Sequence, residues 1–432
     1  MHDTHPSDAI AEAVTAARTD PAPVAGETVH FDVIVVGGGM VGAALARACA
    51  GKGLAIAVIE TRAPRRDWPA GEIDLRVSAL SRASQRILER LGAWERILTL
   101  GANPYRKMCV WDALGGGTVH FDAATLGQPD LGHIVENRVI QLALWETLEA
   151  SPEISLICPA AITDLSLGED GARLRLGDGR SLQGRLLVAA DGRDSLVRER
   201  VGIETEGHDY AQRAIVANVR PRDWHQETAW QRFLPTGPLA LLPLADGRCS
   251  LVWSATESRA AELLAMDDGA FSAALTDASE SRLGALRVDG PRAAFSLRLQ
   301  HAKEYVRPGL ALIGDAAHAV HPLAGQGVNL GFLDAAELAA ALELALEQGR
   351  DIAGLWTLRR YERARRGDNA AMLTAMDLIA RAFGNEIAPL ATLRSLGLGL
   401  TDRIAPLKHL FMERALGVSG TLPPLARPVR DD

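Results

Sequence analysis

The stretch FDVIVVGGGMVGAALARACAGKGLAIAVIE, residues 31–60, constrains the fold of this chain more than any other. An apolar, β-branched run leads into Gly37-x-Gly39-x-x-Gly42, small helix-forming residues follow, and a second apolar run ends at Glu60. These patterns predict a strand, a helix and a strand. A unit of this length favours two parallel strands. We therefore expect an α/β fold with a Rossmann-like domain.

The three glycines predict a dinucleotide site. At such a turn they allow a tight bend, close backbone approach to a pyrophosphate, and close packing of helix on strand. The free N–H groups and partial positive charge of the helix N-terminus suit phosphates. Glu60 stands where a carboxylate binds the hydroxyls of an adenosine ribose, which favours FAD or NAD over NADP. The alternative is a glycine-rich turn of purely structural use.

Two later stretches distinguish FAD from NAD. LLVAADGRDSLVR (186–198) and GLALIGDAAHAVHPLAGQGVNLG (309–331) both read as apolar strands that end in Asp and Gly. An Asp at a strand end can accept a hydrogen bond from a polyol hydroxyl. The ribityl chain of FAD is a polyol, and nicotinamide dinucleotides lack one, so we expect FAD.

The remaining patterns predict an FAD-binding domain interwoven with an antiparallel substrate sheet. Strand-like runs lie over 211–254, and the chain reads as helical from the end of GLALIGDAA to about Leu416. The expected parts are a flexible arm at 1–28, an FAD-binding domain at 29–105, 131–203 and 300–345, a substrate domain at 106–130 and 204–299, and a helical C-terminal region at 346–432.

Composition narrows the class of protein. The net charge of −8 argues against a nucleic-acid partner. No apolar run reaches the about 18 residues of a membrane-spanning helix, and residues 1–28 lack the apolar core of a leader. The four cysteines form no CxxC pair, so we expect no metal and free thiols in a reducing compartment. We expect a cytoplasmic protein whose surface touches the inner membrane peripherally.

Taken together, GxGxxG, AADG and GDAAH…P…GQG.N resemble the flavoprotein aromatic hydroxylases of the p-hydroxybenzoate hydroxylase fold, over about residues 31–418. Within them, the chain resembles the ubiquinone-biosynthesis hydroxylases through VHPLAGQGVNLGFLDAAEL, LGHIVENRVIQLALW, RVSALSRAS and LRRYERARR. The resemblance is closest to the branch that hydroxylates 2-polyprenylphenol at ring carbon 5. The branch acting on the methyl-methoxy-benzoquinol is close behind, and the 6-methoxyphenol step is a further alternative.

The resemblance implies FAD-binding roles for a set of residues. Those expected at the ADP half are Gly37, Gly39, Gly42, Glu60 and Arg76. Asn137 is expected on the ribityl or pyrophosphate part, and Asp191 and Gly192 match a motif shared by FAD and NAD(P)H sites. Those expected at the ribityl chain and flavin ring are Gly314, Asp315, Gln326, Gly327, Val328 and Asn329. His321 and Pro322 are expected beside the substrate ring.

The resemblance also implies the chemistry. FAD carries the oxygen transfer, with NAD(P)H and O2 as cosubstrates, so no side chain is assigned as catalytic. The protein must position the ring, exclude water, and stabilise negative charge on the flavin from a helix start near Gly327.

Several of these residues also suit a purely structural role. The alternative for Arg76 is a surface arginine, and the alternative for Asn137 is a helix N-cap. A solvated face would account for Arg193, Arg198 and Arg200, and simple packing would account for His318 and His321. The run YERARR (361–366) reads as a helix face that meets either solvent or lipid.

The substrate wall is expected from LALLPL (239–244) and FSLRL (295–299), whose apolar character suits a polyprenyl tail; ordinary sheet core is the alternative. A small soluble aromatic would instead need an anchor such as Arg213, Arg220 or Arg232.

A different class of function is a flavin-bearing complex subunit without turnover. Expected partners are a polyprenylated phenol or quinol and other ubiquinone-biosynthesis proteins, and a homo-oligomer is left open.

Overall fold

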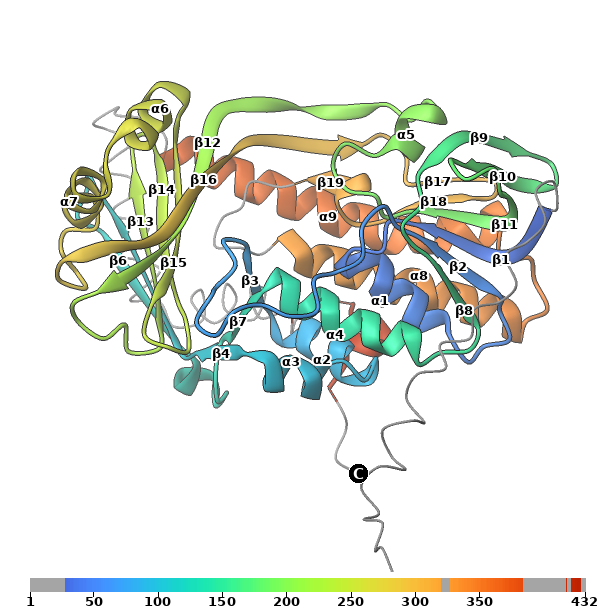
Figure 1. Ribbon diagram of the computed structural model, residues 1–432, viewed down its shortest axis with the longest axis horizontal. Helices are drawn as coiled ribbons and strands as arrows, with labels where there is room; N and C mark the ends of the chain where they lie inside the picture. The colour runs from blue at the N-terminus through green and yellow to red at the C-terminus, as the bar shows by residue number, and fades with distance from the viewer. Residues whose placement is uncertain (1–27, 320–326, 384–416, 418–420, 429–432) are drawn as a thin grey trace, which may run out of the picture.

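The computed structural model describes residues 28–319, 327–383, 417 and 421–428. Two large sheets lie at opposite ends of the molecule, with helices between them (Figure 1). Two long strands, β12 (Thr205–Pro221) and β16 (Leu286–Ala302), run from one end to the other.

The first sheet contains the predicted β–α–β unit. Strands β1 (Thr28–Val36) and β2 (Ile56–Ile59) are parallel neighbours, as predicted. The sheet order is β17-β18-β11-β1-β2-β8, and β10 and β9 extend it from β11. The bounds of the other strands are β8 (Ile154–Ile157), β9 (Ile162–Gly168), β10 (Gly171–Leu176), β11 (Ser181–Ala189), β17 (Val306–Arg307) and β18 (Leu310–Leu312).

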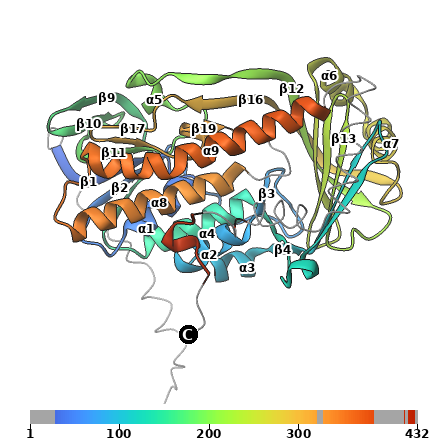
Figure 2. The ribbon, with the colours of Figure 1, turned by 180° about the vertical axis from the view of Figure 1, so that it is seen from behind.

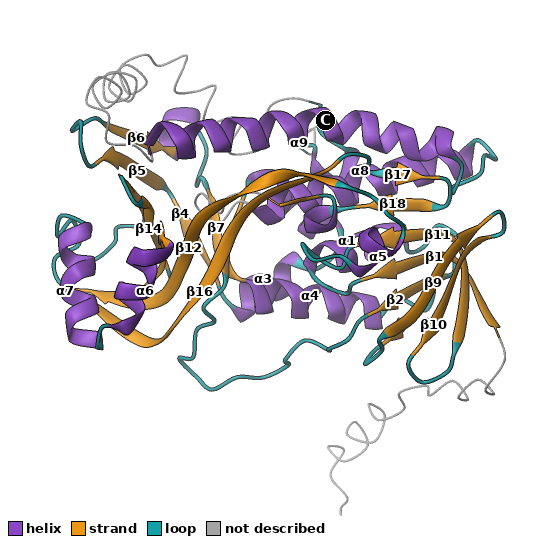
Figure 3. Ribbon diagram, turned by 90° about the horizontal axis from the view of Figure 1, so that it is seen from above, coloured by secondary structure: helices purple, strands orange, loops and turns teal. Residues whose placement is uncertain are grey.

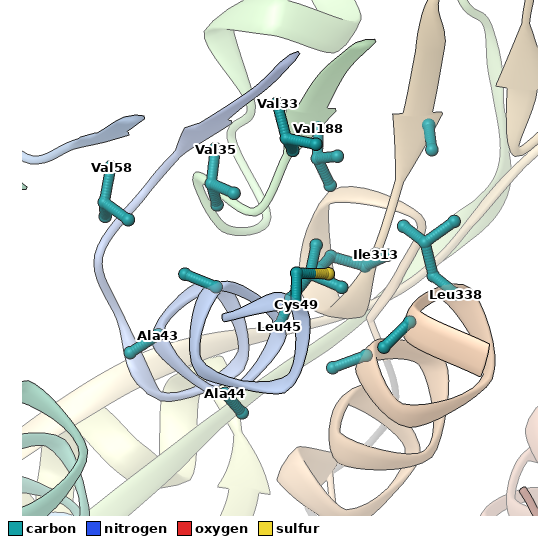
Figure 4. Close-up of a cluster of buried hydrophobic side chains, with 14 of the residues drawn as sticks. Val33, Val35, Ala43, Ala44, Leu45, Cys49, Val58, Val188, Ile313 and Leu338 are labelled. Atoms are coloured by element: carbon teal, nitrogen blue, oxygen red, sulfur yellow. The ribbon is translucent and has the colours of Figure 1, made fainter. Parts of the chain in front are cut away.

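Helix α1 (Met40–Cys49) packs beneath this sheet. Its small residues Ala43 and Ala44 are fully buried together with Leu45, and Val33 and Val58 of the strands lie over them (Figure 4). Helix α8 (Gly327–Glu347) lies beside α1 in the same core. Small side chains on α1 therefore let two helices and a sheet approach closely.

The second sheet has the order β19-β16-β12-β15-β14-β13-β5-β6. Strands β12 to β15 pair antiparallel, as predicted for 211–254, and β5 and β6 form a hairpin. Strand β5 also pairs parallel with β13, which was not predicted. The remaining bounds are β5 (Lys107–Asp112), β6 (Thr118–Asp122), β13 (Thr228–Leu234), β14 (Gly237–Pro243), β15 (Cys249–Thr256) and β19 (His318–Ala319).

A third, small sheet lies between the two large ones. It consists of β3 (Val77–Leu80), β7 (Gly132–Glu136) and β4 (Ala102–Tyr105). The shorter helices are α2 (Arg82–Arg90), α3 (Trp94–Leu100), α4 (Asn137–Glu149), α5 (Leu196–Arg200), α6 (Glu257–Ala265) and α7 (Asp268–Ala278). Helices α6 and α7 cover the outer face of the second sheet.

Helix α9 (Leu355–Phe383) is the longest and runs along the outside of the molecule from the first sheet toward the second (Figures 2 and 3). Helices α8 and α9 agree with the predicted helical region as far as Phe383; residues 384–416 lie outside the described residues. The predicted arm also lies outside them, except that Thr28 already belongs to β1. No helix among the described residues is long and apolar enough to cross a membrane.

Candidate functional site

The glycine-rich turn between β1 and α1 has room for a pyrophosphate. A Cβ on Gly37, whose φ is +103°, would lie 2.3 Å from the Ala190 carbonyl oxygen, and one on Gly42 would lie 1.9 Å from the Gly37 oxygen. Both positions therefore require glycine for the turn itself. A Cβ on Gly39 would meet nothing within 4 Å. Gly39 thus faces open space at the N-terminus of α1, where a phosphate group would bind.

Glu60 closes this turn. Its carboxylate Oε2 accepts a hydrogen bond from the Gly38 backbone N–H at 2.8 Å. The Trp145 indole donates to the Gly38 carbonyl oxygen at 2.6 Å. Glu60 is half-buried directly after β2, at the carboxyl edge of the first sheet. Its Oε1 accepts hydrogen bonds from the backbone N–H groups of Thr61 and Arg62 and from the Thr61 hydroxyl.

Strand register brings the three predicted motifs to one edge. Val36 of β1 is level with Ala189 of β11, and Ala189 is level with Leu312 of β18. All three strands are parallel, so the turns that follow them lie side by side at the carboxyl edge of the sheet. Ligands of open α/β sheets bind at this edge. The structure thus collects Gly37, Asp191 and Asp315 from segments far apart in the sequence.

Asp191 has an unused acceptor. Its Oδ2 accepts from the Val197 N–H at 3.1 Å, whereas Oδ1 is buried without a partner. Desolvation raises the pKa of this carboxyl, against hydrogen bonds from Ser195 and the Val197 backbone that lower it. A donor hydroxyl from a ligand would satisfy Oδ1, so the residue fits a polyol-bearing cofactor. Gly192 beside it has a φ of +87° and faces open space.

Asp315 is solvent-exposed although protein atoms surround its carboxyl group. Desolvation raises its pKa, which means that protein atoms surround the carboxyl, yet its side chain is solvent-exposed. The positive charges of His318, when protonated, Arg76 and Arg193 act in the opposite direction. An exposed acid with dense surroundings and nearby cations is expected at the wall of a ligand site. Arg76 is itself exposed, and its guanidinium lies 5.8 Å from the Phe295 ring.

Two predicted cofactor residues use their side chains elsewhere. Asn329 is buried; its amide oxygen accepts from the Ser81 N–H and the Ser84 hydroxyl, and its nitrogen donates to the Ala79 carbonyl. Asn137 accepts from the Ser78 hydroxyl at 2.7 Å. The N-cap alternative for Asn137 is wrong, because Glu136 holds the cap position and Asn137 begins the helix.

The start of α8 lies next to this edge. Gly327 and Val328 are its first residues and are half-buried. Gly314 precedes Asp315 with a φ of +59°, and a Cβ there would lie 3.2 Å from Val41. His321, Pro322 and Gln326 lie outside the described residues.

A fully buried acid, Asp334 of α8, holds this region together and was not predicted. Its Oδ2 accepts from the Gly314 N–H at 3.1 Å and bonds His318 at 2.5 Å. Its Oδ1 accepts from Arg365 at 2.9 Å and from Asn369 at 3.0 Å, both on α9. Burial alone would raise the pKa of Asp334, but His318, Arg365 and Asn369 outweigh burial and lower the pKa to about 2. We call Asp334, His318, Arg365 and Asn369 the Asp334 cluster.

The Asp334 cluster bears on two interpretations of the sequence, the solvated face of YERARR and the structural role of His318. Within YERARR, Tyr361 and Arg365 are buried, so this run is not simply a solvated face. His318 is a packed, paired histidine, in agreement with the structural role considered for it. Arg198 is likewise buried, and its guanidinium donates to the Ala316 and Arg193 carbonyls rather than lying on a solvated face. The sequence of α8 did not single out Asp334, because the helix also carries Glu337, Glu343 and Glu347.

The second sheet presents an inner wall to this site. Leu239 and Leu241 pack outward under α6 and α7, whereas Ala240 and Leu242 point inward against the third sheet. Phe295 shares the inward row with Ala214 and Ser254 and reaches Arg76. Half of the LALLPL run is therefore outer core, and half belongs to the wall. The wall also holds buried polar atoms without partners, Asn218 Oδ1, Gln231 Oε1, Ser250 Oγ and Ser254 Oγ.

The three arginines of the soluble-aromatic alternative are placed differently. Arg213 alternates with Ile215 and so points to the outer face, and Arg232 is bound to Glu280 outside the sheet. Arg220 lies near the end of β12, where Asp289 pairs with it at 2.9 Å. None of the three arginines is placed on the inner wall to bind the carboxylate of a small aromatic substrate.

Comparison with known proteins fits this geometry. The sequence profile described as "FAD binding domain" matches residues 30–375. The chain is 40% identical over 389 residues to 3-demethoxyubiquinol 3-hydroxylase of Escherichia coli (strain K12), covering 90% of this chain and 98% of that protein. The chain belongs to the FAD-dependent hydroxylases of ubiquinone biosynthesis. The resemblance found in the sequence is thereby confirmed.

Further relatives of this hydroxylase agree. It is 42% identical over 386 residues to ubiquinone hydroxylase UbiL of Rhodospirillum rubrum, covering 89% of each chain. It is 39% identical to the mitochondrial ubiquinone biosynthesis monooxygenase COQ6 of Homo sapiens, covering 88% of this chain and 92% of that protein. The hydroxylase is therefore a flavoprotein monooxygenase with FAD as cofactor, and it takes part in a ring hydroxylation of ubiquinone biosynthesis.

Solved structures share its fold. PqsL of Pseudomonas aeruginosa, a probable FAD-dependent monooxygenase, superposes with a TM-score of 0.72 at 25% identity, covering 85% of this chain and 99% of that one. The p-nitrophenol 4-monooxygenase PnpA of Pseudomonas putida DLL-E4 superposes at 0.73 with 20% identity, covering 90% and 98%. The predicted α/β fold with an antiparallel sheet and a helical C-terminal part is confirmed.

Proposed function

We propose that the hydroxylase acts on a polyprenylated phenol or quinol whose ring lies between the inner wall and the edge that carries Asp315. The observation that carries the proposal is the contact of Arg76 with Phe295, which joins the FAD-binding edge to the inner wall. The wall is mainly apolar, with Val216, Ala240 and Leu242 inward, and suits a ring with a hydrocarbon tail.

In this proposal the predicted residues divide the cofactor between them. Gly37, Gly39, Gly42, Glu60 and Arg76 hold the ADP half, and Asn137 lies at the ribityl or pyrophosphate part. Gly314 and Asp315 hold the ribityl chain, and Asp191 and Gly192 lie where FAD and NAD(P)H are both bound. Gly327 and Val328 meet the flavin ring, flanked by Gln326 and Asn329, and His321 and Pro322 meet the substrate. FAD supplies the oxygen transfer, with NAD(P)H and O2 as cosubstrates. The α8 N-terminus stabilises negative charge on the ring through its helix dipole.

Two ring positions are candidates for the reaction. The motifs HIVENRVI and HPLAGQGVNLG favour ring carbon 5 of 2-polyprenylphenol. The similarity to a protein named 3-demethoxyubiquinol 3-hydroxylase, aligned over 98% of its length, favours a quinol that lacks one methoxy group. We further propose that the chain divides into FAD-binding, substrate and C-terminal parts at the expected bounds. We also propose that the enzyme is cytoplasmic, lies at the inner membrane and works with other proteins of the pathway.

Deletion of the gene decides between these steps. Mass spectrometry of the accumulating intermediate should find a polyprenylated ring that lacks one oxygen, and its substitution pattern names the step. The wild-type gene should restore the quinone. Asp315→Ala should fail to restore it, whereas Asp194→Ala, which changes an exposed acid near the same edge, should succeed. Unchanged intermediates in the deletion strain would instead support a flavin-bearing subunit without turnover.

A further inference from the structure

The outer face of α9 carries a strip of positive charge. Arg359, Arg360, Arg363 and Arg366 are all exposed, and residues three and four apart lie on one side of a helix. No described residue forms a hydrogen bond or ion pair with the guanidinium group of any of the four. Arg365, on the buried side of the same helix, is by contrast bound to Asp334. The strip therefore has no directly paired counter-charge, on a chain whose net charge is −8.

Apolar side chains stand at both ends of this arginine strip. Trp356 is 52% exposed, and the Arg350 guanidinium lies 3.7 Å from the centre of its ring. At the other end, Leu378 and Ile379 are 61% and 38% exposed. Leu378 lies on the same side of α9 as Arg360, about five helical turns away, whereas Ile379 lies on the side of the buried Tyr361. A tryptophan, a row of arginines and an exposed leucine on one side of a helix form the pattern of a helix that lies on a membrane surface. Figure 2 shows that α9 lies on the outside of the molecule along its length.

The far end of α9 also borders a cavity of mixed polar and apolar lining, with Tyr210, Gln212 and Arg381 among its polar residues. This cavity of about 160 Å³ lies between the end of α9 and strands β13 and β14, lined by Phe233, Leu234, Pro238, Ala380 and Phe383 among others. Phe233 belongs to the inner wall and stacks on Phe383 with ring centres 4.1 Å apart. The cavity thus lies where the inner wall meets the last turns of α9, close in sequence to Leu378.

We propose that the outer face of α9 docks the hydroxylase on an anionic lipid bilayer. The arginine strip contacts the anionic headgroups, Trp356 and Leu378 enter the interface, and the tail of the substrate reaches the inner wall past Phe233 and Phe383. The proposal rests on the proposed function, because a polyprenylated ring is itself a membrane lipid. The Asp334 cluster fixes the opposite side of α9 to the loop that bears Asp315, so the docked helix is held rigidly to the cofactor edge.

Co-sedimentation of the FAD-loaded full chain with vesicles tests this proposal. The wild-type protein should bind vesicles that contain phosphatidylglycerol, should not bind vesicles of phosphatidylcholine alone, and should dissociate as salt is raised. Each arginine near an anionic surface strengthens binding by about fivefold. Reversing two charges with Arg359→Glu and Arg363→Glu should therefore weaken binding by about a hundredfold or more. Equal binding of the wild type to both kinds of vesicle would overturn the proposal.

A matched control separates the strip from net charge. Arg173→Glu with Arg175→Glu makes the same change in charge at exposed positions of β10 and should leave vesicle binding within about twofold of wild type. Flavin absorbance and thermal unfolding check that both double variants are folded and loaded. Equal weakening in the two variants would overturn the proposal. So would an α9 variant that loses a dimer in light scattering while still binding vesicles, because the strip would then contact a second copy.

Turnover distinguishes this proposal from the proposed function. The α9 variant should hydroxylate a detergent-dispersed short-chain substrate at the wild-type rate and a vesicle-embedded substrate at least about tenfold more slowly. A wild-type protein that hydroxylates neither substrate contradicts the proposed function, whereas its vesicle binding is still measured independently. Equal rates of the variant and the wild type on embedded substrate would overturn the docking proposal alone.

Discussion

At the scale of single residues, the glycines of the first turn have separable tasks. Gly42 has no room for a Cβ because the Gly37 oxygen would lie 1.9 Å away. Gly39 has room, and its φ of −67° is one that any residue adopts. One glycine is thus required by the fold and the other by the ligand.

Alanine at Gly42 should therefore lower stability, whereas alanine at Gly39 should weaken FAD binding. Gly42→Ala should destabilise the protein by roughly 1–3 kcal/mol, through overpacking. Gly39→Ala should keep the unfolding free energy of the cofactor-free protein within about 0.5 kcal/mol. It should nevertheless weaken FAD binding at least about tenfold, because the methyl group lies where the pyrophosphate approaches. Urea unfolding and FAD titration measure the two effects, and wild-type FAD affinity in Gly39→Ala would contradict this assignment.

Asp334 is the residue on which the buried cluster depends. Asp334→Asn leaves the buried Arg365 with only the exposed Asp368, 3.7 Å away, as a counter-charge, so unfolding free energy should fall by about 3–5 kcal/mol at pH 7. Asp368→Asn is the control, because Asp368 also pairs with Arg365 but its side chain is 63% exposed. The control should change stability by no more than about 0.5 kcal/mol.

The same cluster predicts a pH dependence. The pKa of Asp334 is about 2 in the folded state and 3.8 ordinarily. Since the folded value is the lower one, its ionisation stabilises the fold fully above about pH 5, by about 2–3 kcal/mol, and this contribution is lost as pH falls toward 2. The stability gap between wild type and Asp334→Asn should therefore narrow between pH 5 and pH 2. A gap that stays constant over this range would show that the charge of Asp334 is not the cause.

At the scale of elements, the helices and strands that were predicted correctly are those whose pattern lies within one segment of the sequence. The β–α–β unit and the antiparallel strands over 211–254 each follow from periodicity within one segment. The parallel pairing of β5 with β13 joins residues over 100 positions apart and leaves no local pattern. The burial of Arg365 and Tyr361 was missed for the same reason. Their partners, Asp334 and the Leu312 carbonyl, lie on other elements, and a polar helix position reads as solvated until its partner is known.

The site divides in the same way. Gly37, Asp191 and Asp315 were predictable because each follows an apolar strand, and parallel strands end at one edge. The side-chain partners of Asn137 and Asn329 were not predictable from the sequence. Ser78, Ser81 and Ser84 reach them only through the packing of β3 and α2 against α4 and α8.

Close packing of α1 on α8 is a second property of the elements that can be tested. A Cβ on Gly331 of α8 would lie 2.5 Å from a methyl carbon of Val41 on α1. Gly331→Ala should therefore destabilise the protein by roughly 1–3 kcal/mol. Adding Val41→Ala should recover part of this loss, with a coupling energy of about 0.5–3 kcal/mol in a double-mutant cycle measured by urea unfolding. Additive losses would show that the two helices tolerate the methyl group in another way.

At the scale of the whole molecule, the cofactor site is assembled from three distant segments. The edge combines residues near 37, 191 and 315, and α9 braces it through the Asp334 cluster while reaching the second sheet with Met376. A ligand bound there should therefore stabilise the molecule as a whole. Removing FAD and returning it at a hundredfold excess over its Kd should raise unfolding free energy by about 2.7 kcal/mol in one cooperative transition. Two separate transitions, only one of them sensitive to FAD, would contradict a site shared by the whole molecule.

Transfer of oxygen to a polyprenylated ring is the central claim, and isotope incorporation tests it most directly. The FAD-loaded protein is supplied with NADH or NADPH, heavy-isotope dioxygen, and a short-chain 2-polyprenylphenol or 3-demethoxyubiquinol. Mass spectrometry should find one labelled oxygen atom on the ring for each NAD(P)H oxidised. Consumption of NAD(P)H that yields hydrogen peroxide and no labelled ring, with both substrates, would contradict the claim.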